Sequence, residues 1–330
     1  MINIGIVVTE RCQASGVFMA IDLIIAANFA ARKYFNNSER LFNYQLIGLG
    51  RRATAYNGNQ ITGLVKIQDC ARPDVVILPG AFEAVLDHQQ MDILLKKIPK
   101  LIATLSTWHR AGSVVAAVCT GNFILASAKI SSRRTLTCHW ASQESATHLF
   151  PDESFDSGKL LIDHGDIVSA GGSAAMSQLI LYLVSRFHSR ELALATGKLM
   201  MIELNFDKQS RFAIFRPKQD HGDNIVAKLQ RKIETSFDRD LNTGEFADQE
   251  GIGLRQLTRR FKKATGETPL SYLQHYRVEQ VKIGLESTAK TPLDLIWAVG
   301  YEDPASFRRL FKRLTGLTMQ AYRSRFSATL

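Results

Sequence analysis

The sequence predicts an α/β N-terminal domain, with a mostly parallel sheet and flavodoxin-like layering, followed by an all-α C-terminal domain with two helix-turn-helix units. Short apolar runs alternate with helical segments in residues 1–208, whereas after residue 225 the pattern is helical only. One helical pattern then occurs twice. With 330 residues, the chain also exceeds the usual size of a single hydrophobic core.

The elements of the first domain follow from the lengths of its apolar runs. Buried parallel strands are short and continuously apolar, whereas helices are longer. We expect these elements at Ile2–Val8, Gly16–Arg32, Tyr44–Leu49, Val75–Leu78, Met91–Gly112, Val114–Val118 and Met176–His188. Because such sheets bind ligands at the carboxyl ends of their strands, a binding site is expected at that edge.

A polar linker at 209–224 is expected to join the first domain to a C-terminal domain of residues 225–330, since it contains Pro217, His221, Gly222 and Asp223. From residue 209 onward there are 21 Lys and Arg against 14 Asp and Glu, compared with 20 against 17 before it. The basic second domain favours a polyanionic partner, with nucleic acid ahead of a membrane surface.

Within the C-terminal domain, a short helix, a glycine turn and a basic helix ending in Thr-Gly occur at Thr243–Gly266 and again at Pro292–Gly316. In each copy two apolar residues four positions apart can pack inward, while long donors on the other face reach base edges in a major groove. The repeat therefore predicts double-stranded DNA as a partner. The expected turns are Gly251–Gly253 and Gly300, the expected C-terminal caps are Gly266 and Gly316, and the helix between the copies is expected at about Leu270–Ser287.

Residues from about 230 to 326 resemble the AraC/XylS DNA-binding domain. The resemblance rests on Leu257-Thr-Arg-Arg-Phe-Lys-Lys-Ala-Thr-Gly, Tyr272-Leu with Arg277, and Val299-Gly-Tyr-Glu-Asp-Pro-Ala-Ser-Phe-Arg-Arg-Leu-Phe-Lys. Trp297 and Met319 depart from the family pattern, which usually has alanine and proline there. Any one arginine can instead be solvated or contact phosphate. The resemblance implies a DNA-binding set of Arg255, Thr258, Arg259, Lys262, Pro304, Ala305, Arg308 and Arg309.

Cys119 stands where a buried strand runs into a helix, in Ser113-Val-Val-Ala-Ala-Val-Cys-Thr-Gly, which is the layout of a nucleophile elbow with Gly121 permitting the turn. The positive end of a helix dipole predicts a lowered pKa for this thiol. Here the chain resembles the PfpI-like branch of the class I glutamine amidotransferases. Further matches are Pro73–Gly80, Thr137–Trp140, Phe150–Pro151 and Ile167–Ser173.

Two positions differ from the catalytic members of that branch, which usually have histidine directly after the cysteine and a glutamate near the first helix. This chain has Thr120 after the cysteine, and Cys12–Gly16 at the other position. Because no base is evident, no catalytic residue is expected, and His139 beside Trp140 is expected to be a packed residue. A cysteine-dependent amidase or hydrolase using Cys119 is the alternative.

The two resemblances together cover nearly the whole chain, which is similar to GlxA-type AraC regulators. This family implies transcription regulation, more often activation, controlled by a small-molecule effector such as an amine or amino-acid derivative. RNA polymerase and a second copy of the chain, forming a homodimer, are further expected partners. An architectural DNA-binding protein without an effector would leave the first domain unexplained. The expected effector pocket consists of Ser15, Gly80, Cys119, Thr120 and His139.

No metal site, cofactor or membrane span is expected. The four cysteines, Cys12, Cys70, Cys119 and Cys138, lack the paired spacing of metal ligands and are expected to be thiols. The first residues form a strand-like apolar run in place of a signal peptide, and the apolar stretch Val17–Ala27 is too short for a bilayer. The expected location is the cytoplasm.

Overall fold

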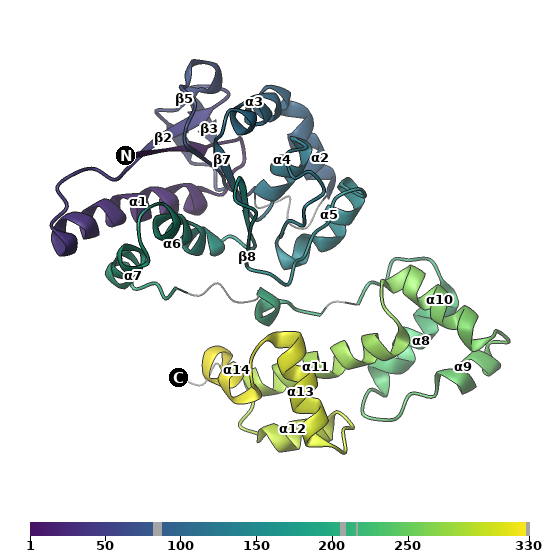
Figure 1. Cartoon of the computed structure of the whole chain (residues 1–330). Helices are drawn as coiled ribbons and strands as arrows, with labels where there is room; N and C mark the ends of the chain where they lie inside the picture. Colours follow the sequence, from purple (N-terminus) through teal and green to yellow (C-terminus); the bar gives the residue numbers. More distant parts are fainter. Residues whose placement is uncertain (82–87, 205–208, 216, 328–330) are drawn as a thin grey trace. The chain divides into compact units, whose positions relative to one another are not determined.

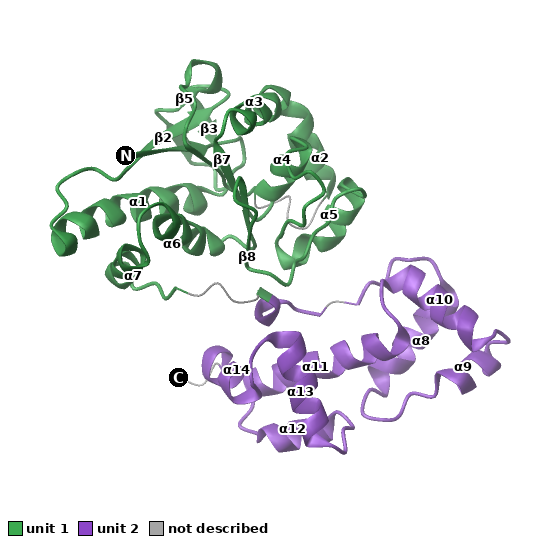
Figure 2. Ribbon diagram, viewed as in Figure 1, with its two compact units in different colours: residues 1–209 green, residues 210–330 purple. Residues whose placement is uncertain are grey.

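The computed structural model describes residues 1–81, 88–204, 209–215 and 217–327. They form two compact units, Met1–Gln209 and Ser210–Leu330 (Figure 2). Unit 1 is an α/β domain and unit 2 contains only helices (Figure 1). The predicted fold classes are therefore confirmed.

Unit 1 is built on a seven-stranded sheet in which every neighbouring pair is parallel except the pair formed by the last two strands. A separate antiparallel hairpin consists of β3 (Arg52–Thr54) and β4 (Gln60–Thr62). The strand order in the sheet is β5 (Val65–Lys66), β2 (Phe42–Gly48), β1 (Ile2–Val7), β6 (Val75–Leu78), β7 (Val114–Val118), β9 (Ile167–Ala170) and β8 (Leu161–Asp163).

Helices cover both faces of this sheet, and each face has its own hydrophobic core. Successive strand residues point to opposite faces, so Val75 and Ile77 of β6 lie in one core and Val76 and Leu78 lie in the other. The first face carries α1 (Ala14–Phe35), α6 (Ala175–Phe187) and α7 (Arg190–Leu199). The second carries α2 (His88–Lys97), α3 (Pro99–Arg110), α4 (Gly121–Ser127) and α5 (Gln143–Leu149).

The segment Met91–Gly112, predicted as one helix, is two helices, and that prediction was wrong. The chain breaks at Ile98, and Pro99 begins α3. Proline has no N–H to donate within a helix and its ring displaces the preceding turn, so it fits at a first helical position but not in the interior.

Helix α1 is the one described helix that is long and apolar enough, by length and composition alone, to cross a membrane. Half of its most apolar window is buried inside unit 1. Its residues Val17, Leu23 and Ala27 are fully buried in the core above the sheet. This is the packing of a core helix in an α/β domain.

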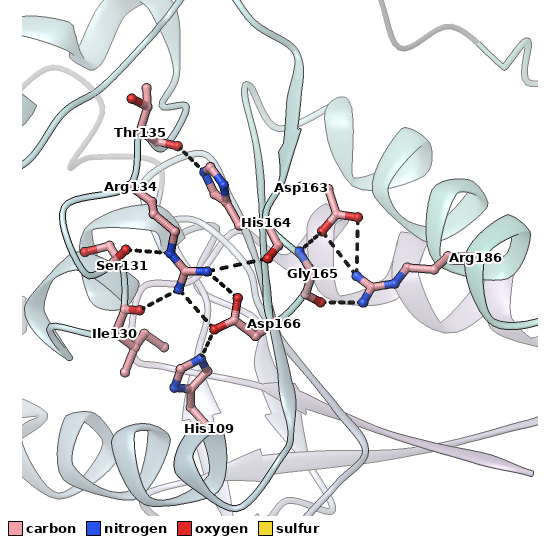
Figure 3. Close-up of polar contacts among 10 residues, drawn as sticks. All are labelled: His109, Ile130, Ser131, Arg134, Thr135, Asp163, His164, Gly165, Asp166 and Arg186. Atoms are coloured by element: carbon pink, nitrogen blue, oxygen red, sulfur yellow. Dashed lines mark hydrogen bonds and ion pairs between the residues drawn. The ribbon is translucent and has the colours of Figure 1, made fainter.

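A network of charged side chains joins α3 to the β8–β9 end of the sheet (Figure 3). Asp166 accepts two hydrogen bonds from the guanidinium of Arg134, and its Oδ2 lies 2.7 Å from Nε2 of His109. The hydrogen bonds from Arg134 hold the pKa of Asp166 well below its ordinary value, against the opposing effect of burial. This network is far along the strands from Cys119, because Asp166 precedes β9 whereas Cys119 follows β7.

The described residues of unit 2 form seven α-helices over two small cores that share one long helix. Tyr272 and Leu273 of that helix, α11, contribute to the first core, and Val281 and Leu285 contribute to the second. The helices are α8 (Asn224–Thr235), α9 (Thr243–Gln249), α10 (Leu254–Thr265), α11 (Pro269–Ser287), α12 (Pro292–Ala298), α13 (Pro304–Thr315) and α14 (Met319–Phe326).

The predicted repeat is visible in atomic detail. Helices α10 and α13 both end at a glycine in the left-handed region, Gly266 with φ 84° and Gly316 with φ 77°. In each copy the threonine before that glycine donates to the carbonyl four residues earlier, at 2.8 Å for both Thr265 and Thr315. The turns predicted from glycine also adopt positive φ, with Gly300 at 74°. The sequence repeat therefore encodes two structurally equivalent units.

The segment predicted as a linker does not run free where the structure describes it. Residues 213 and 215 are held on α11, since Lys282 donates to the carbonyl of Ala213 and the N–H of Phe215 donates to Glu279 at 3.1 Å. The ring of Phe215 also stacks on His275 at a centroid distance of 5.7 Å. These residues are part of the second unit's packing.

Candidate nucleic-acid interface and effector site

Helix α10 presents a basic face to solvent because the two apolar residues of its repeat stripe, Leu257 and Phe261, pack on the other side. Leu257 and Phe261 are fully buried, whereas Arg255, Arg259 and Lys262 are exposed. Thr258 is half-buried between them, and its hydroxyl donates to the carbonyl of Leu254 at 3.0 Å. Three cations on one side of one helix suit the phosphate-lined major groove.

Helix α13 repeats this division. Asp303 caps its first turn by accepting the N–H of Ala305 at 2.9 Å, and Pro304 occupies the first position. Phe307 and Phe311 are fully buried, and the side chains of Arg308 and Arg309 are exposed. Arg309 lies 4.0 Å from Asp303, a distance that leaves its guanidinium available to another acceptor.

A groove of about 520 Å³ lies beside the basic face of α13. Two helices begin at this groove, α12 at Pro292 and α14 at Met319, and their first N–H groups carry the positive end of each helix dipole. Such a groove suits a phosphate. It is lined by Pro292, Arg308, Arg309, Lys312, Thr318, Met319 and Gln320.

The two departures from the family pattern are accommodated without damage to this region. Met319 is 5% exposed, packs in the second core and begins α14, where Thr318 caps the helix by accepting the N–H of Ala321. Trp297 is 56% exposed on α12. Neither side chain displaces an expected DNA-binding residue.

Cys119 in unit 1 has the backbone geometry of an elbow, but not for the reason predicted. Its own φ is 58°, in the left-handed region that disfavours side chains. The expectation that Gly121 supplies the turn was wrong. Glycine is needed there because a Cβ would lie 2.2 Å from the carbonyl oxygen of Leu78. The close approach of α4 to β6 therefore fixes the position of Cys119.

The predicted fall in the pKa of Cys119 was also wrong. Burial raises the pKa of this thiol to about 11, although hydrogen bonds from Thr120 and Ser173 act in the opposite direction. The side chain is only 1% exposed. Loss of hydration disfavours a thiolate more strongly than the dipole of the short helix α4 favours it.

Three of the five expected pocket residues come together. A Cβ on Gly80 would lie 2.9 Å from Cβ of Cys119 and 3.2 Å from Oγ1 of Thr120. Thr120 links this helix start to the segment after β6, because its hydroxyl accepts the N–H of Ala81 at 2.8 Å and donates to the carbonyl of the same residue. Ser15 lies in the first turn of α1 and is exposed.

His139 approaches the same region through Gly172 and Ser173. A Cβ on Gly172 would be 3.0 Å from the ring of His139, and the next residue, Ser173, hydrogen-bonds to Cys119. The Nδ1 atom of His139 accepts the N–H of Ala141 at 3.1 Å. Burial lowers the pKa of the imidazole, which favours its neutral form.

Sequence reasoning missed two buried amides beside this site. Asn122 donates to the carbonyls of Cys119 and Ala170, while its own Oδ1 has no partner within the described structure. Gln209, the last residue of unit 1, is 2% exposed; its side chain accepts the N–H of Trp140 and donates to the carbonyl of Cys138. Local sequence does not reveal these roles, since the partners of Gln209 and one of the two partners of Asn122, Ala170, lie far away in the sequence.

Over the part of the chain that the structure describes, no group of three His, Cys, Asp or Glu side chains could hold a metal ion. The four cysteines are free thiols. In the same way as for Cys119, burial raises the pKa of Cys12 to about 11 and that of Cys138 to about 12.

Comparison with known proteins matches each unit to a family. Residues 246–325 match the helix-turn-helix domain family that contains the AraC regulators, and residues 42–186 match the DJ-1/PfpI family. A solved structure from Vibrio parahaemolyticus, assigned as a transcriptional regulator protein, aligns with a TM-score of 0.51 and 15% identity. The alignment covers 60% of this chain and 98% of that one, and it shows the fold of the unit that it matches.

Two regulators are similar over most of the chain. The transcriptional regulator GbdR of Pseudomonas aeruginosa is 24% identical over 321 residues, which is 96% of this chain and 82% of GbdR. The transcriptional regulator GlxA of Rhizobium meliloti is 25% identical over 232 residues, 67% of this chain and 68% of GlxA. The chain thus has a DJ-1/PfpI-type domain and an AraC-type helix-turn-helix domain, and it is similar over most of its length to these DNA-binding transcription regulators.

Proposed function

We propose that this regulator reads a DNA operator with α10 and α13, and that a small metabolite bound in unit 1 controls it, most simply as an activator. The observation that carries the proposal is the pair of equivalent basic helices on either side of α11. That helix has 19 residues, which makes it about 28 Å long at about 1.5 Å per residue. This length approaches the spacing of about 34 Å between successive major grooves on one face of DNA.

Within each recognition helix the exposed arginines have the reach for base edges. Arg255, Arg259 and Arg309 are assigned to guanine, which accepts two hydrogen bonds from one guanidinium. The groove beside Lys312 and the start of α14 is assigned to the DNA backbone. Thr258, Lys262, Pro304, Ala305 and Arg308 complete the proposed contact surface.

The effector site is assigned to the carboxyl ends of β6 and β7, around Gly80, Cys119, Thr120 and His139, with Ser15 at its rim. We propose a sensor rather than an amidase, because a buried thiol with a raised pKa is a poor nucleophile near neutral pH. The Nδ1 atom of His139 already accepts the N–H of Ala141, so the lone pair that a general base would use is engaged there.

A homodimer is also proposed, with α1 as its contact. The solvent face of this helix carries Phe18, Asp22, Ile25, Phe29 and Arg32, spaced alternately by four and three residues as in a coiled-coil seam. Phe18, Ile25 and Phe29 are 46–50% exposed. Exposed aromatic and aliphatic side chains in one row favour a protein partner.

The charges on this row select one arrangement of two copies. A parallel pair would place Asp22 against Asp22 and Arg32 against Arg32, which is repulsive. In an antiparallel pair centred between Ile25 and Phe29, these two residues face each other across the two-fold axis, and Asp22 faces Arg32. A second copy of the chain in this arrangement is thus complementary to this helix in charge.

The experiment that tests the proposed function is recovery of genomic DNA fragments by the full chain at stated salt, beside a variant with Arg259→Ala and Arg309→Ala. A few discrete sites that the variant loses are expected. Diffuse recovery by both proteins would overturn the proposal. Transcription in vitro from a recovered site, with RNA polymerase and a metabolite panel that includes amines and amino acids, then tests activation and the effector. The proposed location is the cytoplasm, where the DNA and the polymerase are.

A further inference from the structure

Gln209 fills a polar slot in unit 1 that is built for its side chain. Its Nε2 donates to Oγ1 of Thr137 at 3.2 Å, to the carbonyl of Cys138 at 2.6 Å and to the carbonyl of Lys159 at 3.1 Å. Its Oε1 accepts the N–H of Trp140 at 3.3 Å. The slot therefore offers oxygen acceptors to an NH₂ group and an N–H donor to a carbonyl oxygen, which suits a primary carboxamide.

The fold leaves room for this amide at one glycine. A Cβ on Gly171 would lie 2.7 Å from the Cδ, Oε1 and Nε2 atoms of Gln209, closer than real Cβ contacts permit. The N–H of Gly171 is bonded to the carbonyl of Leu160 at 2.8 Å, so the backbone there is fixed. Any side chain at position 171 would push the amide out of its slot.

The slot adjoins the proposed effector site. Gly171 is followed by Gly172, which lies against His139, and by Ser173, which hydrogen-bonds to Cys119. Gln209 is also the last residue of unit 1 and begins the 3-10 turn Gln209–Phe212 with which the chain passes into unit 2. The side-chain amide of Gln209 therefore links the end of unit 1 to residues next to the proposed effector site.

We propose that Gln209 is an internal ligand of this slot, and that the effector competes with it through a primary amide, whose NH₂ donates and whose oxygen accepts as those of Gln209 do. This inference rests on the proposed effector-controlled function. On entry, such an amide would bond to the same acceptors and release Gln209. Residue 209 would then no longer be held in unit 1, which changes the effective concentration of the DNA-binding unit at its operator.

The slot is tested first by trypsin cleavage of the full chain after Arg211, a residue that is 4% exposed, with fragments identified by mass spectrometry. Gln209→Glu keeps the shape of the side chain but places a carboxylate against the three oxygen acceptors of the slot. Gly171→Ala fills the space that the amide occupies and leaves residue 209 unchanged. Both variants are expected to be cleaved at least ~10-fold faster than the natural chain, because cleavage follows the open population. Gly50→Ala is the control, since a Cβ there has ordinary room at 3.5 Å from its nearest neighbour.

The chemistry of the slot is tested with two small probes on the natural chain. Propionamide at tens of millimolar is expected to speed cleavage after Arg211 at least ~3-fold, because it competes with Gln209 for the slot and releases the chain there. Propionate has the same size and no N–H, so it is expected to have no effect. Equal effects of the two probes, or natural cleavage rates in both slot variants, would overturn the proposal. None of these readouts uses DNA, so they stand or fall separately from operator binding.

Discussion

Asp223, which caps α8, is held at the same time by recognition helix α10. Its Oδ1 accepts the N–H groups of Ile225 and Val226, and its two oxygens accept Nη2 and Nε of Arg260 at 2.8 and 2.9 Å. The guanidinium of Arg260 holds the pKa of Asp223 below its ordinary value. The segment that enters unit 2 is therefore bonded directly to a helix that is expected to contact DNA.

Replacing Asp223 by alanine is expected to destabilise unit 2. The helix loses its cap, which costs about 1–2 kcal/mol. The folded pKa of Asp223 is depressed, so its contribution is present above the unfolded value of about 3.8 and is lost as pH falls below it. Urea unfolding of the full chain at pH 7 and at pH 3 measures both effects.

Asp220→Asn is the matched control, because Asp220 is exposed in the same segment. The cap explanation fails if Asp223→Ala and Asp220→Asn unfold at the same urea concentration at pH 7. Arg260→Gln separates the two roles of Asp223, since it leaves the cap in place and removes the guanidinium. It is expected to reduce the difference between pH 7 and pH 3.

The helix-turn-helix repeat could be predicted from sequence because its determinants are local. Gly266 and Gly316 end their helices through their own backbone conformation, and the Leu257 and Phe261 stripe is visible at a spacing of four residues. Gln209 could not be predicted in this way. Its partners Thr137 and Lys159 are 72 and 50 residues away, and only the folded chain brings them together.

The site around Cys119 was predictable in position but not in electrostatics. The strand-to-helix junction follows from the apolar run that ends at Val118. The sign of the pKa change depends on how completely later segments cover the thiol, and the 1% exposure of Cys119 is a property of the whole domain. The local sequence indicates the helix dipole, which lowers the pKa of Cys119, but not the burial, which raises this pKa by more.

Alanine at the two turn glycines is expected to have unequal effects. Gly251 and Gly300 both have positive φ, which costs an alanine about 1 kcal/mol. At Gly300 a Cβ would also lie 2.0 Å from the backbone oxygen of Asp238, whereas at Gly251 nothing lies within 4 Å. We expect a loss of about 1 kcal/mol for Gly251→Ala and more than ~3 kcal/mol for Gly300→Ala in urea unfolding. Equal losses in the free energy of unfolding would show that the backbone at Asp238 moves to make room for the added Cβ.

Alkylation of the cysteines should follow their burial. Cys70 is half-buried and is expected to react first with iodoacetamide at pH 7.5, whereas Cys119 stays protonated and covered. Its labelling should become appreciable only as pH approaches about 11. Peptide mass spectrometry of the native chain distinguishes the two thiols. Labelling of Cys119 as fast as Cys70 at pH 7.5 would revive the amidase alternative.

Charge reversal on α1 tests the proposed dimer. Asp22→Arg and Arg32→Asp each place like charges opposite each other in the antiparallel pair, so dimer dissociation constants should rise at least ~10-fold. The double variant restores opposite charges and should recover the dimer. Lys100→Asp on α3 makes the same charge change on the other face of the sheet and serves as control.

Sedimentation equilibrium of the full chain gives the association constants of these α1 variants, and flotation with anionic phospholipid vesicles tests whether this apolar face instead meets a membrane. Two outcomes would show that α1 is not the dimer contact. The natural chain could stay monomeric at 100-fold the expected working range of concentration, or the two single variants could associate as tightly as the natural chain. If the single variants lose the dimer and the double variant regains it, a general loss of stability is not the cause. The double variant carries both substitutions and would then be affected at least as strongly.

Base and phosphate contacts should be separable on α13. Arg309→Ala is expected to cost about 1–3 kcal/mol at the recovered operator and to relax the preference at one base pair. Lys312→Ala, in the groove at the start of α14, should weaken binding similarly for all sequences and reduce the slope of log affinity against log salt by about 1. Arg231→Ala, an exposed cation on α8, is the control. If Lys312 alone changed sequence preference, the assignment of base and phosphate contacts would have to be exchanged.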